Sequence, residues 1–366
     1  MKILFAIKSL AATGGAERVF CSVGRELAWR GHEIILATFD IPGTPSFYSL
    51  DGVIRRFDLG VGGAGHRVRV IETLRRMMAL RRVAESERPQ VAVGFMHSMF
   101  VPLSLALVGM GIPVVGSEHI VPEHYSSRPL EFALFLLSSP MLRKVTVLSE
   151  TIRDQYPRLI RRRMVAMANP VIPASGRAKP ADEKPRYILL SVGRLDAQKD
   201  QATLIHAFAS LSAKWPDWQL KIFGEGPLRG KLSALVESLG MADRVTLPGI
   251  TRDIAAEYRG ADVFVLPSRY EAFGLVTAEA MSYGLPVVGF ADCLGTNELI
   301  EDGSSGLLVT PGDDRAKSLA QALGSLFANR PLRLRMGEAG LSAVKKMRSI
   351  ASVGKSWECL LSAAGK

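Results

Sequence analysis

Short apolar runs alternate with amphipathic segments along almost the whole chain. Such alternation indicates a parallel sheet with helices packed against it. A segment rich in proline, alanine and charge, 173–186, interrupts the pattern. We therefore predict an α/β protein of two doubly wound domains, 1–172 and 187–366, with a linker over 173–186 and a last helix that is a candidate to cross back to the first domain. The expected strands are 2–7, 33–38, 90–95, 113–116, 144–149, 187–192, 220–223, 244–247, 263–266 and 285–288, and the expected helices include 16–29, 66–88, 130–142 and one that begins at 201, capped by Asp200.

One stretch of the second half, 267–290, reads PSRYEAFGLVTAEAMSYGLPVVGF. It predicts a strand end, a turn with Glu271 and Gly274, a helix that carries Glu279 about two turns further on, and another strand. The helix N-terminus at Gly274 and Leu275 would offer free backbone N–H groups to an anion such as phosphate. Two carboxylates beside it would accept hydrogen bonds from hydroxyl groups. The stretch therefore predicts a site for a sugar nucleotide.

The net charge of +11 is uneven, because residues 1–170 hold 22 Lys and Arg against 14 Asp and Glu. Nucleic acid, an anionic membrane or an anionic substrate could each explain the excess. No nucleic-acid motif with interleaved aromatic residues occurs, so we expect no nucleic-acid partner and place a membrane surface first. The basic segment 66–88 could be a helix on anionic lipid, or the solvated face of a packed helix, and both readings stay open. Its apolar members are Leu74, Met77, Met78 and Leu80, and its basic members include Arg67, Arg69, Arg75, Arg76, Arg81 and Arg82.

The cysteines and the N-terminal residues indicate in which cellular compartment the protein works. Cys21, Cys293 and Cys359 lie far apart and without metal-ligand spacing, which indicates a reducing compartment and no disulfide framework. The first apolar run is too short to span a bilayer and leads straight into a glycine loop, so we read it as a core strand and not as a signal peptide. We expect a cytoplasmic protein that could lie on the inner face of the membrane.

Several candidate site residues follow expected strands of the first half. Gly14 and Gly15 follow the first strand, where open α/β sheets bind ligands, although a glycine pair alone can be an ordinary loop. His119 follows strand 113–116. His97, expected in a loop after strand 90–95, and His124 are rival candidates for a histidine in the site. Two further histidines, His32 and His206, read as structural.

A set of motifs in fixed order resembles glycosyltransferase family 4, whose members have the two-domain GT-B fold and form the retaining "group 1" glycosyltransferases. The resemblance covers nearly the whole chain. It implies two Rossmann-like domains that face a central cleft, the first for the acceptor and the second for the nucleotide sugar. The matching motifs are Gly14–Arg18, Val192–Leu195 with Lys199, Gly224–Pro227, Glu271 with Glu279, and the segment 298–309.

The resemblance assigns the diphosphate of the donor to Arg194 and Lys199. Two cations there would neutralise the pyrophosphate and stabilise the leaving nucleoside diphosphate. Gly224 belongs to the glycine turn of the donor site, and Gly15 would let the backbone approach the phosphate. The family is generally independent of a divalent metal, so no metal site or cofactor is expected.

The resemblance also assigns the hydroxyl groups. Glu271 would contact the transferred sugar, close to the backbone N–H groups of Phe273, Gly274 and Leu275. Glu279 would accept hydrogen bonds from the ribose, and His119 would face the sugar. Taken singly, each has a structural alternative: Glu271 as a carboxylate favoured by the helix dipole, and His119 as a hydrogen-bonded core residue. Likewise, Arg194 or Lys199 alone could be a surface charge.

The expected reaction moves a hexose or N-acetylhexosamine from a nucleoside diphosphate sugar, UDP first, to a hydroxyl of a glycan, a lipid-linked oligosaccharide or a lipopolysaccharide. The family retains anomeric configuration, which implies attack on the face that the leaving phosphate occupies. The alternatives are an epimerase or hydrolase of the same fold, or an inactive sugar-nucleotide-binding protein. A NAD-dependent enzyme is disfavoured, because no G-x-G-x-x-G follows the first strand. The loop 292–298 lacks the Gly-Pro pair that is frequent in the family. Which hydroxyls of the sugar this loop contacts is therefore left open.

Overall fold

The computed structural model describes residues 1–11, 14–50, 54–61, 70–178, 185–347 and 349–365. The chain forms two compact units, one of Met1–Pro170 with Arg348–Lys366 and one of Val171–Met347. The last segment, which the sequence assigned to the second domain with a candidate crossing, thus belongs to the first unit. The described part of the expected linker belongs to the second unit. Each unit is described by itself.

The first unit is built on a seven-stranded parallel sheet in the order β3-β2-β1-β4-β5-β6-β7. The strands β1 and β4 at its centre are almost fully buried, because apolar residues fill both faces. β3 is a short strand at the edge of the sheet. The strands are β1 Lys2–Ala6, β2 Glu33–Thr38, β3 Arg55–Asp58, β4 Val91–Phe95, β5 Val114–Ser117, β6 Leu142–Val147 and β7 Met164–Ala166.

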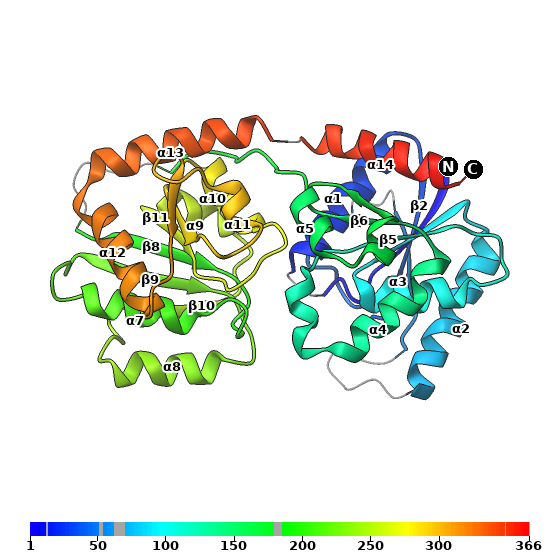
Figure 1. Cartoon of the computed structure of the whole chain (residues 1–366), viewed down its shortest axis with the longest axis horizontal. Coiled ribbons are helices and arrows are strands. Elements are labelled where there is room, and N and C mark those ends of the chain that lie inside the picture. The colour runs from blue at the N-terminus through cyan, green and yellow to red at the C-terminus, as the bar shows by residue number, and fades with distance from the viewer. Residues whose placement is uncertain (12–13, 51–53, 62–69, 179–184, 348, 366) are drawn as a thin grey trace. The chain divides into compact units, whose positions relative to one another are not determined.

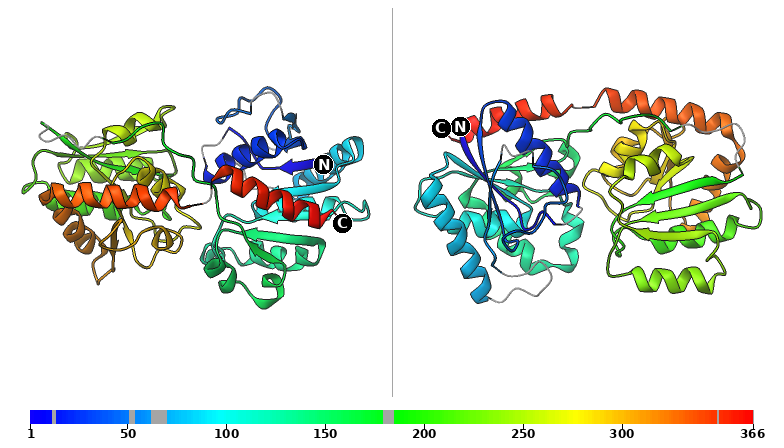
Figure 2. Two further views of the ribbon diagram at one scale, coloured as in Figure 1. Left: turned by 90° about the horizontal axis from the view of Figure 1, so that it is seen from above. Right: turned by 180° about the vertical axis from the view of Figure 1, so that it is seen from behind.

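Helices cover both faces of this sheet (Figure 1). On one face, α14 packs along α1, and both chain ends lie side by side (Figure 2). Trp357 of α14 stacks on Phe95 of β4 with ring centroids 6.0 Å apart, so the last helix closes the first core. On the other face, α3 packs between α2 and α4. The helices are α1 Gly15–Trp29, α2 Val70–Glu87, α3 His97–Ala106, α4 Pro129–Ser138, α5 Glu150–Gln155, α6 Arg158–Arg161 and α14 Ile350–Ala364, with 3₁₀ helices η1 Pro122–Ser127 and η2 Ser139–Met141.

Two local predictions for this unit were wrong. The helix expected over 130–142 ends at Ser138 and continues as a 3₁₀ turn that contains Pro140, because proline lacks the N–H that an α-helix needs. His97 was expected in a loop, but it is the first residue of α3 and is buried. The chain turns sharply just before it, at Met96, whose φ is 70°.

The second unit has a six-stranded parallel sheet in the order β10-β9-β8-β11-β12-β13. The strand order reverses between β8 and β11, which makes their carboxyl ends the position where open α/β sheets bind ligands. The strands are β8 Tyr187–Val192, β9 Trp218–Phe223, β10 Val245–Gly249, β11 Val263–Leu266, β12 Val287–Phe290 and β13 Gly306–Val309, and the helices are α7 Gln201–Leu211, α8 Arg229–Ser238, α9 Ile254–Gly260, α10 Leu275–Ser282, α11 Thr296–Leu299, α12 Arg315–Ala328 and α13 Arg330–Lys345.

Asp200 precedes α7, but its predicted side-chain cap is absent. The residue adopts a left-handed conformation with φ of 48° and makes no capping hydrogen bond. Its carboxylate lies 2.9 Å from the guanidinium of Arg269 instead. An ion pair between this helix start and the loop after β11 thus takes the place of a local helix cap.

Across the described ranges, no helix combines the length and the apolar character that crossing a bilayer would require. The three cysteines are free, with Cys21 and Cys293 buried and Cys359 exposed. Burial raises the pKa of both buried thiols to about 12, so they stay protonated at neutral pH.

Candidate functional site

Lys199 and Glu271 meet at the strand-order reversal of the second unit. Lys199 follows β8 and Glu271 follows β11, and Lys199 Nζ lies 2.5 Å from Glu271 Oε1. Ser268 Oγ donates a second hydrogen bond to the same oxygen, at 2.7 Å. All hydrogen bonds of this carboxylate within the described residues therefore use Oε1. Its second oxygen is left to accept a hydrogen bond from a ligand.

Arg194 lies in a turn that is held by glycine packing. A Cβ on Gly224, whose φ is 139°, would stand 2.0 Å from the carbonyl oxygen of Gly193. Only glycine lets the two backbones approach this closely. Gln201 Nε2 donates to the carbonyl oxygen of Arg194 at 2.8 Å, while the Arg194 side chain is 71% exposed. The backbone of Arg194 is thus fixed, whereas its exposed guanidinium, with Nε 3.6 Å from Asp196 Oδ2, can turn toward an anion.

The predicted turn and helix of 267–290 are present. Gly274, with φ of 74°, precedes α10, and Leu275 is the first residue of that helix. The backbone N–H groups of the first turn of an α-helix have no acceptor within the helix, so they can face an anion. The loop at Gly295 packs tightly on this turn, because a Cβ there would lie 2.8 Å from the backbone nitrogen of Phe273.

Glu279 is buried in α10, with 6% of its surface exposed. The hydroxyl of Tyr258, on α9, donates to Glu279 Oε2 at 3.2 Å and lies 3.3 Å from the carbonyl oxygen of Val276. Glu271 and Glu279 thus lie in different polar surroundings, one next to an ammonium group and the other next to a phenol.

In the first unit, Gly15 is exposed and begins α1. Gly14 precedes it with an extended backbone, and the carboxylate of Glu17 occupies the space that a Cβ on Gly14 would need. A side chain at Gly14 would therefore displace Glu17 from the helix start.

His119 follows β5 and is largely buried. Its ring stacks on Phe95 with centroids 5.5 Å apart, and Nε2 lies 2.9 Å from Ser117 Oγ. Thr146 donates to Ser117 Oγ, so the Ser117 proton is left for His119 Nε2 and the imidazole proton belongs on Nδ1. Nδ1 is buried and has no hydrogen-bond partner among the described residues. Burial lowers the pKa of His119 to about 4, so the ring is neutral at physiological pH.

The rival histidines, His97 and His124, form a second cluster. His97 Nε2 lies 3.0 Å from Glu131 Oε2, and its Nδ1 lies 3.6 Å from Glu118 Oε2. Burial alone would lower the pKa of His97, but the two carboxylates outweigh it and raise the pKa above its ordinary value. The hydroxyl of Tyr125 donates to buried Glu118 at 2.7 Å. The cluster is therefore a charged network beside the neutral His119.

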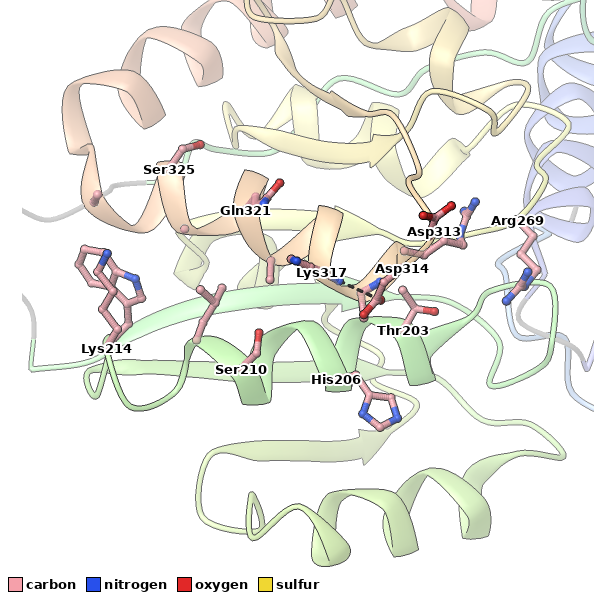
Figure 3. Close-up of a pocket in the computed structure, with 17 residues that line it drawn as sticks. Thr203, His206, Ser210, Lys214, Arg269, Asp313, Asp314, Lys317, Gln321 and Ser325 are labelled. Carbon is pink, nitrogen blue, oxygen red and sulfur yellow. Dashed lines mark hydrogen bonds between the residues drawn. The ribbon is translucent and has the colours of Figure 1, made fainter.

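The two histidines predicted to be structural differ. His32 Nε2 lies 3.1 Å from Glu358, so this ring joins α14 to the first strands, as a structural residue would. His206 is exposed on α7 and lines a groove of about 1100 Å³ between α7 and α12 (Figure 3). Lys317, Gln321 and Ser325 face this groove from α12. It contains none of the predicted site residues, so we do not place the donor there.

The basic helix α2 is a mixed case. Ile71, Leu74 and Met78 are more than half exposed, whereas Leu80 is fully buried. Arg76 turns inward, donates to the carbonyl oxygen of Val61 at 3.1 Å and stacks on a buried aromatic ring. Part of the predicted basic face thus serves packing. Arg67 and Arg69 lie outside the described residues.

The structure therefore gathers Lys199, Glu271 and Gly274 at one edge of the second sheet, with the Arg194 turn at the end of the neighbouring strand β8. Sequence reasoning missed three supporting residues: Ser268, Tyr258 and Gly295. Ser268 directly follows a buried strand and a proline, which was a usable signal. No signal in the sequence pointed to Tyr258, because its partner Glu279 is 21 residues away.

Comparisons with known proteins identify the class. Residues 13–174 match the family described as Glycosyltransferase Family 4, and residues 175–342 match Glycosyl transferases group 1. A Haemophilus influenzae protein called an uncharacterized glycosyltransferase is 27% identical over 345 residues, which cover 92% of this chain and 93% of that protein. The chain belongs to glycosyltransferase family 4 and is a glycosyltransferase.

Solved structures agree on the fold. The Anabaena protein HepE, in complex with UDP and glucose, matches with a TM-score of 0.81 at 20% identity, covering 99% of this chain and 100% of HepE. WaaG, described as a glycosyltransferase involved in lipopolysaccharide biosynthesis, matches with a TM-score of 0.78 at 18% identity, covering 98% of this chain and 99% of WaaG. The two parallel sheets form a GT-B fold, as the resemblance implied.

Proposed function

We propose that this enzyme transfers a hexose or N-acetylhexosamine from a UDP-sugar to a hydroxyl of a lipid-linked glycan or lipopolysaccharide, with retention of anomeric configuration. The observation that carries the proposal is the pair of Lys199 and Glu271 beside the N-terminus of α10. It joins a cation for phosphate to a carboxylate with one unused oxygen. The complex of HepE with UDP and glucose supports UDP as the nucleotide.

In this proposal the donor diphosphate is bound by Lys199, by the exposed guanidinium of Arg194 and by the first N–H groups of α10. These groups stabilise the charge that develops on the leaving diphosphate. The glycine turn at Gly224 keeps the Arg194 backbone in place. Because a lysine ammonium has three protons and Glu271 takes one, two remain for phosphate oxygens.

Glu271 Oε2 would accept a hydrogen bond from a hydroxyl of the transferred sugar, with the backbone at Phe273 and Leu275 nearby. Glu279 would accept from the ribose, and Tyr258 orients its carboxylate. For the first unit we propose that His119 donates a hydrogen bond from Nδ1 to the sugar and that Gly15 lets the backbone approach the phosphate.

The reaction that follows breaks the bond between the anomeric carbon and the diphosphate oxygen. The acceptor hydroxyl forms the new bond on the same face, and its proton passes to the departing diphosphate. Glu271 is held by an ammonium and a hydroxyl through one oxygen, which suits a positioning contact to the substrate. We assign it no nucleophilic role.

The exposed surface of α4 is our reason for proposing a lipid-linked acceptor. Leu130, Leu134 and Leu137 follow one another at helical spacing and are 72%, 46% and 73% exposed. Arg128 at one end and Arg143 beyond the other are also exposed. An apolar face flanked by arginine suits the interface of an anionic membrane. We accordingly place the enzyme in the cytoplasm, at the inner face of a membrane that carries its acceptor.

The donor is tested by thermal shift with UDP-, GDP- and ADP-sugars, followed by product NMR. We expect UDP-sugars to give the largest stabilisation and the product to keep the anomeric configuration. A clean inversion of configuration would contradict the retaining mechanism. Donor turnover without any acceptor would favour a hydrolase or epimerase, and tight binding without turnover would favour an inactive binding protein.

The membrane surface is tested by flotation with phosphatidylglycerol vesicles. We expect wild type to float at moderate salt and a Leu130→Ser/Leu134→Ser/Leu137→Ser variant to remain with the soluble fraction. Ile250→Ser, at another half-exposed apolar residue but in the second unit, is the matched control. Equal flotation of all three proteins would show that α4 is not the membrane contact, and no flotation by wild type would argue for a soluble acceptor.

A further inference from the structure

The chain holds a cluster that the donor chemistry does not use. His97, His124 and Glu131 each direct one potential metal ligand atom to the same place, and these atoms lie within 4.8 Å of one another. Glu131 and His124 are only partly buried, so small side-chain rotations can place the three ligand atoms around one ion. Zinc requires a distance of about 2.0–2.2 Å from the ion to each ligand atom. We propose that these three residues form a binding site for a divalent transition-metal ion of the zinc type.

The surroundings of His97 favour a cation. A neutral imidazole has one N–H group, yet a carboxylate faces each ring nitrogen, Glu118 at Nδ1 and Glu131 at Nε2. The second contact therefore needs a further positive charge. A second proton on the ring can supply it, and so can a metal ion bound by Nε2 and by Glu131, with the ring proton kept on Nδ1.

Glu118 fits the role of an outer carboxylate. A metal-bound histidine usually donates its other N–H group to a carboxylate or carbonyl, which fixes the ring and its tautomer. Glu118 is buried and is held by the hydroxyl of Tyr125 and the backbone N–H of His119. Its Oε2 lies 3.6 Å from His97 Nδ1, which makes no hydrogen bond among the described residues. A small rotation of the His97 ring would therefore bring Nδ1 to this carboxylate.

Arg128 shows that the site already attracts a cation. One guanidinium nitrogen donates to His124 Nε2 at 2.9 Å and lies 3.7 Å from Glu131 Oε2. Its side chain is 49% exposed, so it can turn into solvent when a metal ion takes its place. The guanidinium is therefore a competitor for the same two ligands.

The place of the cluster suggests what the ion does. His97 follows β4 and His124 follows β5, at the carboxyl edge where open α/β sheets bind ligands. Two histidines and one glutamate leave a fourth position of zinc open. That position can take water or an oxygen atom of the acceptor, and the ion would fasten η1 to the start of α4. All three ligands belong to the first unit, so the ion would bind whether or not the donor is present.

The test is Co²⁺ binding to the full chain without a histidine tag, near pH 8, followed through its visible absorption and by displacement with Zn²⁺. We expect one Co²⁺ per chain in wild type and none in a His97→Gln/Glu131→Gln variant. Glu118→Gln should weaken binding about 10- to 100-fold, as outer carboxylates do. His206→Ala, which removes an exposed histidine of the second unit, should leave binding unchanged.

Arg128→Ala is the sharpest variant, because a surface substitution is expected to tighten binding by removing the competing charge. Circular dichroism checks that the His97 variant folds, and Glu131→Gln alone tests the site at a half-exposed residue. Wild-type binding no greater than that of the His97→Gln/Glu131→Gln variant would overturn the proposal. So would binding that Glu131→Gln leaves unchanged, or that Arg128→Ala weakens.

Discussion

Lys199 and Glu271, 72 residues apart in sequence, form an ion pair with Nζ 2.5 Å from Oε1. They follow β8 and β11, which are neighbours in the sheet although two other strands separate them along the chain. The family resemblance gives the two residues separate partners, a diphosphate and a sugar. The ion pair links the two contacts, so a change at either residue should disturb both.

For Lys199→Ala, we expect kcat to fall by about 10²- to 10³-fold, as when one charge-stabilising donor is removed from an active site. The Glu271→Gln variant should also lose activity. The double variant should lose less than the product of the two single effects, because each single variant already breaks the ion pair. Initial rates with a UDP-sugar measure all three.

The matched control is Lys221→Ala. Lys221 pairs with Glu257 at 3.2 Å in the same unit but lies on β9, away from the turn at Gly274. Near-normal turnover of Lys199→Ala would contradict the diphosphate role, and additive effects of the Lys199 and Glu271 variants would contradict their coupling.

Gly295→Ala should reduce both stability and donor affinity. Its Cβ would stand 2.7 Å from the carbonyl oxygen of Glu271, so the turn that carries Glu271 must shift. Gly303→Ala is the control, because Gly303 has a similar φ of 73° but nothing within 4 Å of the added Cβ. Gly303→Ala should lose about 1–2 kcal/mol because of its positive φ. Gly295→Ala should lose more, because its ψ of −50° lies outside the left-handed helical region and its Cβ meets backbone atoms. Only Gly295→Ala should also weaken UDP-sugar binding in calorimetry; equal donor affinity in both would refute the packing argument.

Tyr258→Phe should act on the donor rather than on the fold. The hydroxyl donates to Glu279 Oε2 at 3.2 Å, and its loss removes about 0.5–1.5 kcal/mol of hydrogen bonding. If Glu279 binds the ribose, the variant raises KM for the UDP-sugar several-fold with little change in kcat. Steady-state kinetics over donor concentration separate the two constants. A drop in kcat at unchanged KM would place Glu279 elsewhere in the mechanism.

His119 should titrate far below ordinary histidine. Burial lowers its pKa to about 4, against about 6.5 in the unfolded chain. Between these values the unfolded chain binds a proton that the folded chain does not, so the free energy of unfolding falls as pH drops from 6.5 toward 4. NMR titration of the ring, assigned with His119→Gln, measures the pKa. His119→Gln should also flatten the loss of stability in that window; an ordinary pKa would remove the basis for a neutral hydrogen-bond donor at Nδ1.

The sequence by itself determined the local structure of this protein. Apolar runs such as 263–266 became buried strands because their side chains fill both faces of a parallel sheet. Gly274 marked the start of α10 because glycine adopts the left-handed conformation of that turn at low cost. The ordered motifs, from Gly15 to Glu279, were enough to reach the family and its fold.

Only the tertiary structure decided which of these residues meet. Strand order brings Lys199 beside Glu271, and nothing in either segment encodes that β8 pairs with β11. The same holds for His97, His124 and Glu131, which three separate elements supply. It also holds for Asp200, whose carboxylate forms an ion pair with Arg269 instead of the expected helix cap. Periodicity and turn chemistry act over a few residues, whereas contacts between strand ends depend on how the whole sheet is assembled.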